Sequence, residues 1–211
     1  MNSELQDAGS LQEILAEMGA DSGYERPPTN PIPKEMVLKW MASRDIQALG
    51  ATYAFLFNKP ERRNRVQPPL EYRDYHKFVT HYFERCFREN PDGKWTNNRY
   101  EAGWDLVNWF AFQWNDPEVP RSALDDLKSW MAKLYKEGDA ELRRCFVDAT
   151  LEHLFEQSKF RKFFADWKDD PVLKVAHAEA LEWVKGGGNT PLGKPEGRRL
   201  LSGQLSKKRK R

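Results

Sequence analysis

The sequence predicts an all-α protein, built as a single multi-helix bundle or as a HEAT-like layer of antiparallel helices. Apolar residues recur at i, i+3 and i+4 through most of the chain, whereas no stretch keeps the strict alternation of a strand. Prolines, glycines and capping residues leave only short connections between the helical segments, which favours antiparallel neighbours. No internal repeat persists at a fixed period, and a HEAT-like layer does not require a legible one.

The chain divides into three parts. Its 211 residues are enough for one domain of ordinary size, which can fold without disulfides or metals, plus terminal segments. We expect an N-terminal arm over residues 1–32, a helical domain over residues 33–186 and a disordered basic tail over residues 187–211.

The arm is expected to carry one short amphipathic helix on a tether. Its apolar residues have helical spacing and are Leu11, Ile14, Leu15 and Met18. Ser10 is a plausible N-cap and Gly19 a plausible stop. The segment DSGYERPPTNPIP that follows has four prolines within seven residues, which predicts an extended linker. The tethered helix can therefore dock in cis on the helical domain or in trans on a partner.

The first half of the domain predicts three helical regions separated by loops. Residues 34–58 indicate one broken helix or two short helices that end before Pro60. The basic loop KPERRNRVQPP comes next, and residues 70–88 then keep the spacing of an amphipathic helix. Another helix is expected near residues 98–115.

Three later helices have clear boundaries in the sequence. They are expected between Pro120 and Gly138, over residues 140–157, and from Asp170 to Gly186. Gly138 stands where a left-handed C-terminal glycine belongs, and Asp139 can cap the helix that follows it. Asp170 and Pro171 are a typical N-cap and first helical residue. The total of six to eight helices agrees with the all-α class.

The segment WDLVNWFAFQW, residues 104–114, places three tryptophans and two phenylalanines in eleven positions. On a helical wheel its apolar residues span an arc of about 220°, which predicts a helix enclosed on several sides. Large aromatic residues at helical spacing are usually core, because burial is their favourable term. We therefore interpret this stripe as core rather than as a binding platform.

Phe112 breaks the pattern, because it lies in the narrow polar strip of the same helix with Glu101, Asp105 and Asn108. An exposed aromatic side chain ringed by acid and amide groups is typical of an interface anchor. The alternative is that another helix or the N-terminal arm covers it. These four residues, with the apolar residues of the tethered helix, are the candidate partner-binding surface.

The formal net charge of +2 hides two regions of opposite sign. Residues 1–196 hold 27 basic and 32 acidic side chains, whereas residues 197–211 hold seven basic side chains and no acid. A mildly acidic body suits attraction to a basic partner.

Basic residues also define an alternative nucleic-acid-binding surface. Its candidate residues are Arg62, Arg63 and Arg65 of the loop and Lys207, Lys208, Arg209, Lys210 and Arg211 of the tail. The tail has no aromatic residue for base stacking, so such binding would be weak, salt-sensitive and independent of sequence. The tail can also be an import signal or an inert solubilising end.

The cysteines and the N-terminus indicate the compartment. Cys86 and Cys145 are too few for a disulfide framework and lack Cys-x-x-Cys spacing, so we expect inert core thiols in a reducing interior. The N-terminus is acidic and lacks the apolar run of a signal peptide, and no stretch is long enough to span a membrane. We expect a cytoplasmic protein, or a nuclear one if the tail directs import in a eukaryotic cell.

No motif for catalysis, metal binding or cofactor binding stands out, and we expect none of these sites. A P-loop, a Gly-x-Ser-x-Gly elbow and a Gly-x-Gly-x-x-Gly turn are absent from the sequence. His76 and His81 would lie roughly 140° apart on a helix, too far to share a metal. His153, flanked by Glu152 and Glu156, is a candidate general base, or else a buried histidine bonded to a neighbour.

Residues 95–184 resemble small helical bacterial proteins of unassigned function, some of which occur with toxin-neutralising immunity proteins. The resemblance lies in a Trp-rich helix, a Gly-Asp-x-Glu helix start and a Leu-Glu-x-Leu helix end. The matching positions are Gly138, Asp139, Glu141, Leu151, Glu152 and Leu154. It implies a helical protein that acts by binding a toxin.

Three functional classes follow from these patterns. The leading hypothesis is a non-enzymatic interaction protein, an immunity protein or adaptor that occupies the surface of a basic partner such as a nuclease toxin. The alternative is a nucleic-acid-associated protein that uses the tail and the loop. The third is a helical enzyme centred on His153.

Overall fold

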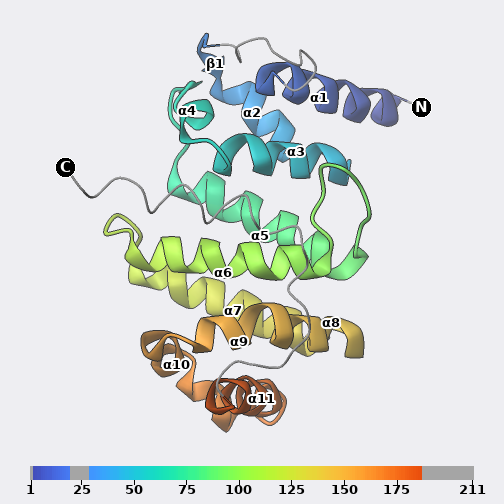
Figure 1. The fold of residues 1–211 in the computed structure, drawn as a ribbon. Coiled ribbons are helices and arrows are strands. Elements are labelled where there is room, and N and C mark those ends of the chain that lie inside the picture. The colour runs from blue at the N-terminus through green and yellow to red at the C-terminus, as the bar shows by residue number, and fades with distance from the viewer. Residues whose placement is uncertain (1, 20–28, 187–211) are drawn as a thin grey trace, which may run out of the picture.

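The computed structural model describes residues 2–19 and 29–186 and confirms the all-α prediction. Helices lie in successive layers from α1 at one end of the molecule to α11 at the other (Figure 1). Most of the predicted linker and the whole basic tail lie outside the described residues.

The elements of the first half are α1 (Asn2–Met18), β1 (Ile32–Pro33), α2 (Lys34–Met41), α3 (Ile46–Phe57), α4 (Pro60–Arg63), β2 (Val66–Gln67) and α5 (Tyr72–Glu89). Those of the second half are α6 (Arg99–Asn115), α7 (Arg121–Glu137), α8 (Ala140–Phe146), the π-helical turn η1 (Val147–Leu151), α9 (Glu152–Phe155), α10 (Ser158–Phe163), the 3₁₀ turn η2 (Ala165–Asp169) and α11 (Leu173–Lys185). Residues 34–58 thus form the second of the two expected arrangements, a pair of short helices.

The first helix belongs to the core rather than to a separate arm. It begins at Asn2 instead of near residue 11, and Ile14, Leu15 and Met18 are buried against the layer of α2 and α3. Almost every residue of α3 is apolar, so the helix has apolar side chains on more than one face. One face packs on α5 and another packs on α1. The cis alternative is therefore the one that the structure adopts.

A short parallel pairing fixes the start of the domain. Ile32 lies opposite Val66, and the Ile32 N–H donates to the Arg65 carbonyl at 2.8 Å. The boundary expected at residue 32 therefore falls inside an ordered contact, and the segment before α2 is tied to the segment after α4.

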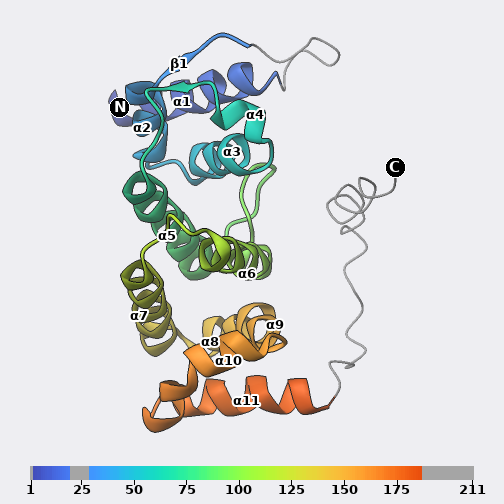
Figure 2. The ribbon, with the colours of Figure 1, turned by 90° about the vertical axis from the view of Figure 1, so that its left-hand side faces the viewer.

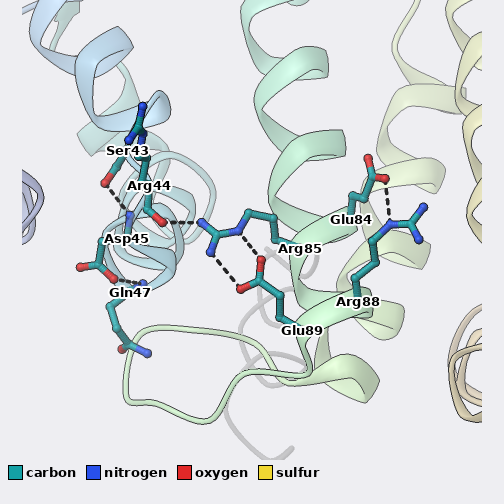
Figure 3. A network of polar contacts seen from close by, with 8 residues as sticks. All are labelled: Ser43, Arg44, Asp45, Gln47, Glu84, Arg85, Arg88 and Glu89. Carbon is teal, nitrogen blue, oxygen red and sulfur yellow. Dashed lines mark hydrogen bonds and ion pairs between the residues drawn. The ribbon is translucent and has the colours of Figure 1, made fainter. Parts of the chain in front are cut away.

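The corner between α2 and α3 is attached to α5 through Arg85, as Figure 3 shows. The Arg85 guanidinium donates to both oxygens of Glu89, at 2.6 and 2.9 Å, and to the Arg44 carbonyl at 2.6 Å. At the same corner, Asp45 caps α3 by accepting the Gln47 N–H at 2.9 Å. The bidentate ion pair thus holds the guanidinium in place while it satisfies a backbone carbonyl of the corner.

The tryptophan-rich helix α6 lies inside the molecule, between α5 and the layer of α8 and α9 (Figure 2). Leu106, Trp109 and Phe110 are buried, while Trp104 and Trp114 are half-buried against the core. The interpretation of the stripe as core is confirmed.

The helix expected over residues 140–157 contains a π-helical turn where it meets α6. A Cβ on Gly103 would lie 2.6 Å from the Ala149 Cβ, and the Thr150 hydroxyl donates to the Gly103 carbonyl at 3.3 Å. The absence of a side chain at Gly103 therefore allows α6 and the π turn to approach closely.

Some of the predicted helix ends agree with the structure and others do not. Asp139 caps α8 as predicted, accepting the Leu142 N–H at 2.7 Å, and Asp170 accepts the Val172 and Leu173 N–H groups at the start of α11. Helix α7 ends at Gly138 as expected, but this glycine is the C-cap in an extended conformation, with φ of −70°, and not a left-handed C′ residue. Three short elements, α4, α10 and η2, were not predicted, since a helix of one turn leaves no apolar period in the sequence.

Within the described residues, no helix is both long enough and apolar enough to cross a membrane.

The contact at Gly103 gives a prediction about stability. Gly103→Ala should lower the urea midpoint, because overpacking costs about 1–3 kcal/mol and outweighs a gain of up to about 1 kcal/mol in helix propensity. Gly186→Ala is the matched control, since a Cβ there would lie 3.5 Å or more from its neighbours. An unchanged midpoint for Gly103→Ala would show that α6 has room to move away from the π turn.

Candidate functional site

The exposed face of α6 contains the four residues predicted as a polar strip. Glu101, Asn108 and Phe112 are exposed, and Asp105 is half-buried. The Glu101 carboxylate accepts the Asn98 N–H at 2.9 Å as part of a capping box, and Asp105 accepts from the Asn97 side chain at 2.7 Å. The two carboxylates therefore stabilise the start of the helix, whereas Phe112 stands at its other end.

Phe112 is 51% exposed, the highest value among the exposed large hydrophobic side chains of the described residues, followed by Val175 at 49% and Tyr100 at 48%. Neither another helix nor α1 covers it among the described residues, so the alternative of a buried Phe112 is excluded there. This observation could be anticipated from the helical wheel alone.

Phe112 forms one rim of an aromatic pocket of about 260 Å³. We use this name for the hollow whose aromatic walls are Phe57 of α3, Tyr72 and Tyr75 of α5, and Trp109 and Phe112 of α6. The rings hold one another by contact: the Phe57 ring meets Trp109 edge-on at 5.3 Å and Tyr75 at 5.9 Å between centroids. Trp109 and Phe112 lie nearly parallel, 6.3 Å apart. The walls are thus built by three separate helices.

Two buried polar atoms on the walls have no hydrogen-bond partner among the described residues. They are the indole N–H of Trp109 and the amide oxygen of Gln113, whose residues are only 5% and 2% exposed. An unpaired buried donor or acceptor costs about 1–3 kcal/mol, so native folds keep few of them without a reason. Both residues line the same hollow from neighbouring turns of α6, but the two atoms themselves are closed off from solvent. The pocket is a candidate binding site through its aromatic walls and the charges at its rim.

Three ionised side chains stand at the pocket, Arg63 from α4 and Asp116 and Glu118 from the loop after α6. None of the three has an ion-pair partner in the described part of the chain. Burial raises the pKa of the Tyr72 and Tyr75 phenols, so both walls stay neutral at ordinary pH. One oxygen of Asp116 accepts the Glu118 backbone N–H at 3.0 Å, so the pocket combines an aromatic interior with charged groups that form no ion pair among the described residues.

Sequence reasoning identified Phe112 but not the pocket around it. Tyr75 and Trp109 were predicted only as part of the apolar faces of two separate helices, over residues 70–88 and 98–115, and Phe57, Tyr72 and Gln113 were not singled out. A signal was present, because Gln113 interrupts the apolar stripe of α6 at a position that the structure buries.

The apolar residues of the tethered helix are not on this surface. Ile14, Leu15 and Met18 are buried in the core and Leu11 is half-buried, so a partner cannot contact the buried three while α1 is in place.

The arginines proposed for nucleic acid mostly hold α1. Arg62 donates to the Met18 carbonyl at 2.9 Å, and Arg65 donates to the Glu17 carbonyl at 3.0 Å and pairs with the Glu17 carboxylate. Cations at the last carbonyls of a helix also complement its dipole. Of the predicted loop residues only Arg63 is left for another ligand, and the tail residues 207–211 lie outside the described ranges.

His153 is enclosed by two tryptophans. Its ring stacks on Trp104 with 3.7 Å between centroids and meets Trp183 edge-on at 5.2 Å, while Nδ1 lies 3.1 Å from Glu156. This geometry corresponds to the second sequence interpretation, a packed histidine bonded to a neighbour.

Glu152, next to His153 in the chain, has a perturbed pKa. Burial, together with the negative charges of Asp148 and Glu179, raises the pKa of the Glu152 carboxyl to about 7. This proton equilibrium makes folding stability sensitive to pH near neutrality.

Both cysteines are buried, and burial raises the pKa of each thiol to about 12. They therefore stay protonated and unreactive at ordinary pH, which agrees with the expected core thiols. In the described ranges, no group of three or more histidine, cysteine or acidic side chains has the geometry to hold a metal ion.

Comparison of the chain with protein-family models, with curated proteins and with solved structures gives no match. The resemblance of residues 95–184 to small helical bacterial proteins stays a prediction.

The role of Arg65 can be tested by hydrogen exchange. Arg65→Gln should speed the exchange of backbone amides in α1 by roughly ten- to a hundred-fold, because charged hydrogen bonds contribute roughly 1.5–3 kcal/mol and here hold one local unit. Arg63→Gln is the matched control on the same short segment. Equal exchange in the two variants would show that α1 is held by apolar packing alone.

The raised pKa of Glu152 gives a pH-dependent prediction. The folded chain keeps the proton up to about pH 7, whereas the unfolded carboxyl loses it near 4.5, so stability should fall as the pH rises through this window. Glu152→Gln removes the buried charge and should raise the Tm at about pH 8 by roughly 2–4 °C, after allowance for partial exposure, and leave it unchanged at about pH 4. Glu182→Gln, on the exposed side of α11, should shift the Tm equally at both values. If Glu152→Gln also shifted the Tm equally at both pH values, burial of the Glu152 charge would not be the cause of the pH dependence.

Proposed function

We propose that this protein is a non-enzymatic interaction module that binds a protein partner through Phe112 and the aromatic pocket. The observation that carries the proposal is the 51% exposure of Phe112 at the rim of a hollow already lined with aromatic side chains. Interface hot spots are typically aromatic anchors beside well-formed pockets, ringed by polar groups. Asp116, Glu118 and Arg63 supply such a polar rim.

Folding by itself offers no reason for this exposure. Burial of a phenylalanine side chain contributes roughly 1.5–3 kcal/mol, and Phe112 forgoes about half of that surface. The neighbouring Trp109 and Gln113 add unpaired buried groups on the same part of α6. Three features that are unfavourable for the isolated chain therefore coincide at one place, as expected where a partner supplies the missing contacts.

The finer proposal is that the partner is basic and that this protein neutralises or recruits it by covering its surface, as an immunity protein or an adaptor does. Residues 1–196 carry an acidic excess of 32 side chains over 27. Such a charge attracts a basic partner over a distance and raises the rate of encounter more than the final affinity. The buried, protonated cysteines favour work in a reducing compartment such as the cytoplasm.

The experiment compares two exposed aromatic residues on one helix. Tagged full-length chain is used to capture partners from a lysate of the source cells, with Phe112→Ala and Tyr100→Ala as variants. Tyr100 is 48% exposed on α6, so it matches Phe112 in exposure but lies away from the pocket. We expect Phe112→Ala to weaken capture of a specific protein by at least about ten-fold, in the range of a hot-spot residue, and Tyr100→Ala to retain it.

Thermal unfolding distinguishes loss of binding from loss of fold. Phe112→Ala should change the Tm by no more than about 2–4 °C, because half of the side chain is already in water. A larger loss would place Phe112 in the core, and equal capture by both variants would remove α6 from the interface.

A further inference from the structure

We infer that the aromatic pocket recognises an arginine side chain of the partner, with its guanidinium between the rings and the carboxylates of Asp116 and Glu118. The inference rests on the proposed function, because it names the chemistry that the same site would bind.

The walls suit a side chain with an apolar stem and a flat cationic end. The five rings offer both faces and edges, and the volume of about 260 Å³ is of the size of one large side chain rather than of a folded element. Arginine places its methylene stem on apolar surface and stacks its planar guanidinium on aromatic faces, where the ring quadrupole attracts the cation.

The same helix already holds an arginine in this way on another part of its surface. The guanidinium carbon of Arg121 lies 4.1 Å from the centroid of Trp114 and 4.6 Å from that of Phe163. The chain therefore has the aromatic geometry for guanidinium stacking within a few residues of the pocket. At the pocket itself the rings have no such cation over them in the described residues.

Two carboxylates at the pocket keep lone pairs available for a ligand. Asp116 accepts the Glu118 backbone N–H at 3.0 Å through one oxygen, and neither Asp116 nor Glu118 has an ion-pair partner among the described residues. Guanidinium carries five N–H donors and no acceptor, so it is the side-chain group best able to serve several acceptors at once.

Charge decides between a cationic and an anionic occupant. Asp116 and Glu118 outnumber Arg63 at the rim, and Asp126 adds a further negative charge near Tyr72. The field at the pocket therefore favours a cation, and Arg63 opposes it. Removal of Arg63 and removal of the two acids should thus have opposite effects, and the two signs would be reversed for an anionic occupant.

The probe for the test is N-acetyl-arginine amide, titrated into ¹⁵N-labelled full-length protein and followed by NMR. We expect saturable shifts in the Trp109 indole signal and in the backbone signals of Gln113 and Glu118. N-acetyl-citrulline amide, which has the same shape without the charge, should bind about two- to five-fold more weakly, the range of a single rim charge interaction.

Three variants test whether each rim charge raises or lowers the affinity for the arginine probe. Asp116→Asn with Glu118→Gln should weaken binding of the arginine probe by about five-fold, and Arg63→Gln should strengthen it by about two- to five-fold. Glu179→Gln with Glu182→Gln removes the same amount of charge from α11 and should leave the affinity unchanged.

Several results would overturn the inference. Equal shifts with citrulline would show that the pocket does not read charge, and tighter binding of N-acetyl-glutamate amide, weakened by Arg63→Gln, would make it an anion site. Tighter binding of the probe after replacement of Arg209 and Arg211 by Gln would make the chain's own tail the occupant, not a partner.

The two proposals can fail separately. If capture of a partner depends on Phe112 while the arginine probe leaves the pocket signals unmoved, the interaction function stands and the recognised chemistry is different. If the probe binds as expected while Phe112→Ala captures the same proteins as Tyr100→Ala, the pocket binds arginine but the proposed interface is wrong.

Discussion

The enclosure of α6 is the constraint on which the rest of the structure depends. Gly103 lets the π turn of residues 147–151 approach one side of the helix, and α5 packs along another. A helix held from several sides must have a wide apolar arc, which is why tryptophans and phenylalanines crowd residues 104–114. It also keeps only a narrow exposed strip, so the position of Phe112 in that strip is fixed by the packing of the opposite faces.

The aromatic pocket follows from the same enclosure. Where α6 nears its C-terminal end, Trp109 packs edge-on against Phe57 of α3, and Tyr75 of α5 completes the contact. These rings line a hollow between α3, α5 and α6, with Phe112 at its rim. The unpaired indole N–H of Trp109 and amide oxygen of Gln113 are an energetic cost of this packing, while Arg63, Asp116 and Glu118 supply the polar groups of the pocket.

Some charged residues of this protein hold its helices together, whereas others form no ion pair among the described residues. Arg62 and Arg65 hold the end of α1, and Arg85 holds the corner before α3 through its pair with Glu89 (Figure 3). Arg63 belongs to the same basic segment as the first two, yet it points to the pocket, where no described acid pairs with it. A run of like charges along the sequence thus serves two purposes in space, and its net charge alone is a poor guide to function.

The sequence by itself determined the class of fold, the cap at Asp139, the buried stripe of α6 and the exposed place of Phe112. Each of these is written within a few residues of the chain, as helical spacing or as a side chain that accepts nearby N–H groups. Only the tertiary structure decided that α1 joins the core, that Arg62 and Arg65 bind its carbonyls, and that Phe57 meets Trp109. Those outcomes depend on contacts between segments about fifty residues apart, and local periodicity shows which face of a helix is apolar but not which partner will cover it.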